Sequence, residues 1–146
     1  MWIIPKQDIT NTLEASGFST TEALAPHDAR ALGQLLRADE YIVGQVVRDS
    51  SGGYRVEPNL VLTRDNSLVQ PLGVFRVGRP DQAAAAISKE FREAQKQYDA
   101  EKNCVRNARE KKYGEAITAA RRGVAEYPKA TLARICLANV YIDQRD

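Results

Sequence analysis

The chain has 146 residues, of which 43% are hydrophobic and 27% are charged, a balance typical of an ordinary globular protein. Its 21 Lys and Arg residues against 19 Asp and Glu residues leave a net charge of +2, which excludes a strongly basic nucleic-acid arm and an acidic tail. One His and two Cys are too few for a structural zinc site, which takes four ligands. No run approaches the roughly 18 apolar residues of a membrane span.

The amino-terminal region predicts one strand and two short helices. Met1–Pro5 lacks the basic start of a signal peptide. Trp and Ile favour strands and Pro stops them, so we expect a strand end here, with a frayed start as the alternative. Asp8 is expected to cap a first helix that ends before Gly17. Pro26 suits the first position of a second helix.

A strand pattern follows the second helix. Tyr41–Val47 is rich in β-branched and aromatic residues, and a turn cluster follows at Ser50–Gly53. Tyr54–Leu62 then alternates apolar and polar residues, although Pro58 interrupts it and indicates an edge strand or a bulge. Leu68–Val77 is expected to complete a three-stranded meander.

Helix-forming residues dominate from Asp81 onward. Asp81 is expected to cap a helix whose apolar residues recur every three or four positions, as in Ile87, Phe91 and Ala94. The change of composition near residue 80 predicts two domains, 1–80 and 81–146. The fold class is therefore α+β, with a small α/β domain followed by an all-α segment.

Residues 97–146 resemble tetratricopeptide repeats, units of about 34 residues that form two antiparallel helices. The resemblance rests on Cys104, Ala108, Tyr113, Ala116, Gly123 and Pro128, and on Ala133, Leu137, Ala138 and Tyr141 in the next first helix. Asn103, Asn107 and Lys111 depart from the pattern, and a generic helical hairpin is the alternative. The resemblance implies one and a half repeats.

Repeats of this kind bind peptides on the surface formed by their first helices. The residues expected on that face are Val105, Arg109, Leu132, Ile135, Asn139 and Ile142. The second repeat stops before its partner helix, which leaves apolar surface uncovered. We therefore expect a protein or peptide partner, self-association, or the continuation of a longer array.

Residues 1–78 resemble the small amino-terminal α/β domain of the TolB translocation protein. The similar residues are Leu36–Val46, Gly53–Val56 and Leu60–Leu62. The resemblance implies a mixed sheet with helices on one face, a binding or assembly role in the bacterial envelope or periplasm, and no enzyme activity.

Cys104 and Cys136 are separated by 32 positions, close to the length of one repeat. Both fall on first helices, and equivalent helices of neighbouring repeats pack side by side. A disulfide is geometrically feasible if the α-carbons come within about 7 Å. The alternative is two buried free thiols.

The remaining candidates for chemistry are weak. His27 has no nucleophile at a spacing that suggests a catalytic site. Gly52-Gly53 lacks the glycine spacing and the Lys of a phosphate loop. Asp39 and Glu40 would point apart on a strand. We expect no catalytic residue, metal or cofactor.

The basic residues between Arg106 and Arg122 are expected to form a solvated face rather than a nucleic-acid site. The sequence thus predicts a non-catalytic protein-interaction or assembly module. The alternative is a regulatory domain that senses a small ligand or anion in its α/β part.

Overall fold

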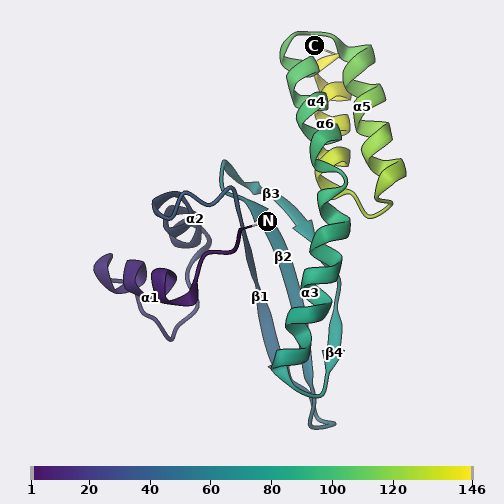
Figure 1. Ribbon diagram of the computed structural model, residues 1–146. Helices are drawn as coiled ribbons and strands as arrows, with labels where there is room; N and C mark the ends of the chain where they lie inside the picture. The colour runs from purple at the N-terminus through teal and green to yellow at the C-terminus, as the bar shows by residue number, and fades with distance from the viewer. Residues whose placement is uncertain (1, 146) are drawn as a thin grey trace. The chain divides into compact units, whose positions relative to one another are not determined.

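The computed structural model describes residues 2–145 and confirms the α+β class. In chain order its elements are α1 (Lys6–Ala15), α2 (Pro26–Leu35), β1 (Glu40–Arg48), β2 (Tyr54–Leu62), β3 (Asp65–Pro71), β4 (Phe75–Val77), α3 (Pro80–Gln95), α4 (Tyr98–Arg109), α5 (Tyr113–Glu126) and α6 (Thr131–Asp143) (Figure 1).

The start of the chain differs from its prediction. The segment from Trp2 to Pro5 has no regular structure, and Trp2 is 78% exposed, so the strand predicted there is wrong; Met1 lies outside the described residues. Apolar side chains form a strand only where they find a neighbouring strand and a surface to pack on. Asp8 lies in the first turn of α1 rather than at its cap, which is Pro5. Pro26 does occupy the first turn of α2.

The four strands form an antiparallel sheet in which β1, β2 and β3 are neighbours in that order. The mixed sheet that the resemblance implied is therefore wrong, because strands that are joined by short turns run antiparallel to one another. The predicted third strand is divided into β3 and β4, and β4 also pairs with β2, with Val56 opposite Phe75. Pro58 stays within β2, and its carbonyl accepts a hydrogen bond from the Leu72 N–H. Because Pro58 has no N–H to donate, the ladder is weakened beside the break between β3 and β4.

The chain divides into two compact units. Unit 1 consists of the segment up to Ile42 and Val61–Ser67; unit 2 consists of Val43–Leu60 and the chain from Leu68 onward. In unit 1 the guanidinium of Arg30 donates from Nε to the Thr63 carbonyl and from Nη2 to the Arg64 carbonyl, at 3.0 and 2.8 Å. The domain boundary near residue 80 stays a prediction.

Unit 2 has a continuous buried cluster that joins the sheet to the helices. Its members are Leu60, Leu72, Phe91, Ala94, Tyr127, Ala130 and Ala133. The first two lie before residue 80 and the other five lie after it. Side chains from the sheet and from the helical segment therefore bury one another. The α3 helix begins at Pro80, with Arg79 as its cap, so Asp81 lies in the first turn and is not the cap.

Candidate protein-binding surface on the last three helices

Small residues let α4, α5 and α6 approach one another closely (Figure 1). A Cβ atom built on Gly123 would lie 2.8 Å from the Ala100 Cβ and 3.1 Å from the Ala133 Cβ. Gly123 therefore lies where all three helices meet, and the resemblance to tetratricopeptide repeats implies a small residue at such a crossing. Beyond this point a second buried cluster fills the space between the helices, formed by Cys104, Ala116, Ala120, Cys136 and Val140.

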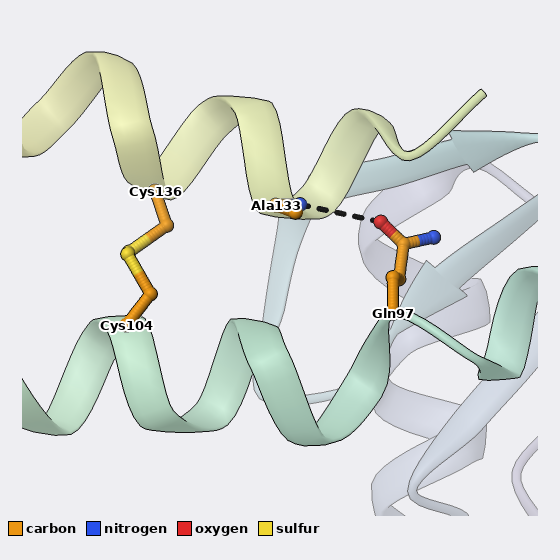
Figure 2. Close-up of a disulfide and its surroundings, with 4 residues drawn as sticks. All are labelled: Gln97, Cys104, Ala133 and Cys136. Atoms are coloured by element: carbon orange, nitrogen blue, oxygen red, sulfur yellow. Dashed lines mark hydrogen bonds between the residues drawn. A yellow bond between two sulfur atoms is a disulfide. The ribbon is translucent and has the colours of Figure 1, made fainter. Parts of the chain in front are cut away.

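A disulfide joins α4 to α6 inside this second cluster (Figure 2). The bond links Cys104 and Cys136, whose α-carbons are 6.4 Å apart. Both cysteines are buried. The two helices are thus connected covalently as well as by packing.

Two buried glutamines hold the start of α6. Gln97, in the turn between α3 and α4, accepts a hydrogen bond from the Ala133 N–H at 3.2 Å (Figure 2). Its amide nitrogen donates to Gln70 Oε1 at 2.9 Å and to the Ala94 carbonyl at 3.1 Å. A helix start has N–H groups without partners inside the helix, and here a side chain from another element satisfies one of them.

Gln70, on β3, completes this network. Its Oε1 accepts from the Thr131 N–H at 2.7 Å, and its Nε2 donates to the carbonyls of Pro71 and Lys129 at 2.8 and 3.1 Å. The network therefore ties the sheet, the α3–α4 turn and the start of α6 together. Sequence reasoning missed both glutamines, since the only signal was an unexplained Gln inside otherwise apolar or helical patterns.

A second polar contact joins α3 to the segment before α6. The Tyr127 hydroxyl donates to Glu90 Oε1 at 2.7 Å, and Lys129 Nζ lies 3.0 Å from the same oxygen. Burial, followed by the hydrogen bond to Glu90, raises the pKa of Tyr127. Burial alone would raise the pKa of Glu90, but its bonds to Tyr127 and Lys129 outweigh that effect and lower it. The carboxylate is thus kept charged by its two partners.

The six residues predicted for the partner-binding face differ in how far they are exposed to solvent. Leu132 is 1% exposed and belongs to the core, so it offers no surface to a partner. Val105 and Ile135 are half-buried, and Val105 packs against the second cluster. The exposed members are Arg109, Asn139 and Ile142, the last of which is 58% exposed.

Ile135, Ala138 and Ile142 form one stripe along α6, which we call the α6 stripe. Their spacing of three and then four residues places them on one side of the helix. Tyr141 lies beside the α6 stripe, and its hydroxyl accepts a hydrogen bond from Arg121 Nη2 of α5 at 3.1 Å. The α6 stripe is therefore an apolar surface on a well-held helix. The hydrogen bonds from Gln70 and Gln97 hold its start, and the disulfide at Cys136 holds its middle.

Lys111 occupies the turn between α4 and α5, where the resemblance would place glycine. Its φ is +58°, in the left-handed region that glycine adopts most easily. The Lys111 N–H donates to the Ala108 carbonyl and the Lys112 N–H to the Asn107 carbonyl, at 2.9 Å each. This pair of bonds is the usual way to end a helix at a left-handed residue. The turn thus keeps its glycine-like shape with a lysine in it.

An open groove of about 570 Å³ lies on α4 and α5. Its lining residues are Asn103, Arg106, Asn107, Gly114, Glu115, Thr118, Ala119 and Arg122. Arg106 Nη2 donates to Asn103 Oδ1 at 2.7 Å, and Arg122 pairs with Glu126 at 3.5 Å. Only part of the positive charge of this segment is paired with carboxylates, through Arg122–Glu126 and through Lys112–Glu110 at 2.6 Å. The alternative function predicts a ligand site in the α/β part of the chain. The groove on α4 and α5 lies outside that part.

Among residues 2–145, no group of three or more His, Cys, Asp or Glu side chains could hold a metal ion. Over the same range, no helix is both long enough and apolar enough to cross a membrane. Compared with known proteins, the chain matches no family model, no curated protein and no solved structure.

Proposed function

We propose that this protein is a non-catalytic interaction module that binds a helix of a partner protein on the α6 stripe. The observation that carries the proposal is the exposure of Ile142, at 58%, on a helix that is otherwise firmly held. Apolar surface on a rigid element is a common basis of protein recognition. A partner helix would shield it from water.

The chemistry of the partner follows from what surrounds the α6 stripe. Spacings of three and four residues form a ridge that fits between the ridges of a second helix. Arg134 lies before the stripe on α6 and Arg145 follows it, and both are exposed. The Arg134 guanidinium, however, donates to the Pro128 and Ala130 carbonyls at 2.6 and 3.3 Å, and Asp143 is exposed beside Ile142. The partner helix should therefore carry an apolar stripe, with no fixed charge beside it. The resemblance to tetratricopeptide repeats supports this arrangement, because in such repeats a further helix packs at this position.

The compartment belongs to the same proposal. A disulfide between Cys104 and Cys136 is favoured in an oxidising compartment. The resemblance of residues 1–78 to the TolB amino-terminal domain also supports the periplasm or the bacterial envelope. We therefore place the interaction there.

Position-specific photo-crosslinking in cells tests the binding surface. A photoreactive amino acid at Ala138 should give a crosslinked adduct, and Ile142→Asp should remove the adduct. The control position is Ala125, which is exposed on α5 and should give no such adduct. Equal crosslinking from both positions, none from either, or an adduct that survives Ile142→Asp would contradict the proposal.

A further inference from the structure

The open groove on α4 and α5 is a candidate binding site separate from the α6 stripe. All of its lining residues belong to unit 2. None of them is among the six residues predicted for the partner-binding face, and none belongs to the α6 stripe. From Gly114 to Arg122 the groove follows α5 for about 12 Å, at roughly 1.5 Å per residue. It is therefore long enough for a segment of another chain.

Arg106 brings a positive charge from α4 to the groove. One of its N–H groups donates to the amide oxygen of Asn103 at 2.7 Å, so its hydrogen-bond partner there is neutral. Glu110 attracts Arg106, but the Glu110 carboxylate is itself bonded to Lys112 Nζ at 2.6 Å. A guanidinium carries five N–H donors in one plane and binds a carboxylate best through two parallel bonds. Arg106 therefore suits a carboxylate of a ligand.

Arg122 brings a second positive charge, from α5. Its Nε lies 3.5 Å from Glu126 Oε1, and both side chains are about half exposed. An exposed pair of this kind contributes little, so a ligand carboxylate can take the place of Glu126. Glu115 is the one acidic residue that lines the groove, and it interacts electrostatically with Lys112. The lining residues thus carry more positive than negative charge.

Asn103 and Asn107 give the groove two half-buried amides on the same side of α4. A separation of four residues corresponds to about 6 Å along a helix. Alternate residues of an extended chain direct their backbone groups to the same side, with a repeat of roughly 6.6 Å. The two amides can therefore bond to alternate residues of an extended peptide. A helical ligand would not use them, because its backbone groups are already bonded to one another.

We propose that this groove binds a short extended segment of a partner protein that carries at least two acidic side chains. A groove of about 12 Å accommodates about four residues of extended chain, at roughly 3.3 Å each. The acidic side chains pair with Arg106 and Arg122, and the backbone of the segment bonds to Asn103 and Asn107. A Cβ atom built on Gly114 would meet nothing within 4 Å, so there is room for the segment beside α5.

Two other kinds of ligand fit these observations less well. A small molecule binds best where a pocket encloses most of its surface, and this groove is open. Single-stranded nucleic acid binds by stacking its bases on aromatic rings, and none of the lining residues is aromatic. An acidic peptide needs neither an enclosed pocket nor a ring.

NMR titration of the isotope-labelled full chain with synthetic peptides tests the charge requirement. The probe is the peptide Ser-Asp-Ser-Glu-Ser-Asp-Ser, blocked at both ends so that its only charges are on side chains. It should bind with a dissociation constant below about 1 mM in dilute salt. The same peptide with Asn and Gln in place of Asp and Glu should not bind in this range. Equal binding of the two peptides, no binding of either, or tighter binding of citrate or of a thymidine oligonucleotide would overturn the proposal.

Three variants distinguish the groove from general electrostatic attraction. Arg106→Gln should weaken binding of the acidic peptide about tenfold, because it removes charge-assisted hydrogen bonds. Arg109→Gln is the matched control, since Arg109 is exposed on the same helix but does not line the groove; it should weaken binding less than about twofold. Glu115→Gln should strengthen binding about twofold, because it removes an opposing charge. Equal losses in the two arginine variants, or a loss in Glu115→Gln, would contradict the proposal.

The same titration locates the site in the unmodified chain and does not depend on a variant folding. The side-chain amide signals of Asn103 and Asn107 and the backbone amide of Gly114 should shift, whereas the backbone amide of Ala138 should not. Shifts confined to α6 would place the peptide elsewhere and overturn the proposal. Crosslinking from Ala138 should persist in Arg106→Gln, so this proposal and the α6 stripe can fail independently.

Discussion

Two glycines of the same helix, α5, lie in opposite surroundings. A Cβ atom on Gly123 would fall within 3.1 Å of two other Cβ atoms, those of Ala100 and Ala133. A Cβ atom on Gly114 would meet nothing within 4 Å. One glycine therefore allows close helix packing, whereas the other only lowers helix propensity. Substituting each glycine in turn therefore measures the effect of helix packing on stability separately from the effect of helix propensity.

Gly123→Ala should destabilise the protein by about 1 to 3 kcal/mol, because the added methyl group must push two helices apart. Gly114→Ala should instead stabilise it by up to about 1 kcal/mol, because alanine loses less backbone entropy on folding. Chemical denaturation followed by circular dichroism measures both free energies of unfolding. A Gly123→Ala variant as stable as the wild type would show that the helices do not meet tightly there.

Gly123 and Leu132 show what could and what could not be predicted from the sequence. The small-residue position of Gly123 could be predicted from the resemblance of residues 97–146 to tetratricopeptide repeats. The burial of Leu132 could not, because helical periodicity alone does not say which of two apolar sides of α6 faces the core. Both sides of α6 carry apolar residues, and only the packing of α4 and α5 against α6 decides between them.

At the scale of elements, α6 has no capping side chain of its own at its start. Its cap residue is Ala130, which cannot accept a hydrogen bond from the helix through its side chain. Gln70 and Gln97 supply the acceptors instead, from positions far away in the sequence. That helices lie on both sides of Pro128 could be anticipated from the resemblance to tetratricopeptide repeats. This capping could not, because it exists only after three distant segments have come together.

Gln97→Ala should lower the free energy of unfolding by about 2 to 4 kcal/mol, because it leaves the buried Ala133 N–H without its acceptor and opens a cavity. The matched control is Gln144→Ala, which lies on the surface after α6 and should change stability by less than about 0.5 kcal/mol. Urea denaturation of both variants is the measurement. Equal losses in the two variants would show that the buried network adds no stability.

At the scale of the whole molecule, the amino-acid composition changes near residue 80, but one buried cluster contains residues from both sides of that position. Leu60, from β2, and Leu72, from the connection between β3 and β4, share a buried cluster with Phe91, Ala94 and Tyr127. Composition reveals where helix-forming residues begin. It does not reveal that those helices need the sheet to complete their core, since that depends on which apolar faces meet.

A fragment of residues 81–146 tests this dependence. Without the sheet it loses Leu60, Leu72 and Gln70 from its core, and each buried Leu side chain contributes about 2 to 5 kcal/mol. The fragment should therefore melt at a lower temperature than the full chain and with a broader transition, as followed by circular dichroism at 222 nm. A fragment as stable as the helices of the full chain would establish residue 80 as an independent folding boundary.

The bond between Cys104 and Cys136 also has a mechanical consequence. The 32 positions between them correspond to about 110 Å of extended chain at roughly 3.4 Å per residue. When the protein is stretched from its two ends, force passes through the sulfur atoms and bypasses that segment. An oxidised molecule in an optical trap should therefore reach a shorter final length than a reduced one by about this amount, with α5 left out of the loaded path.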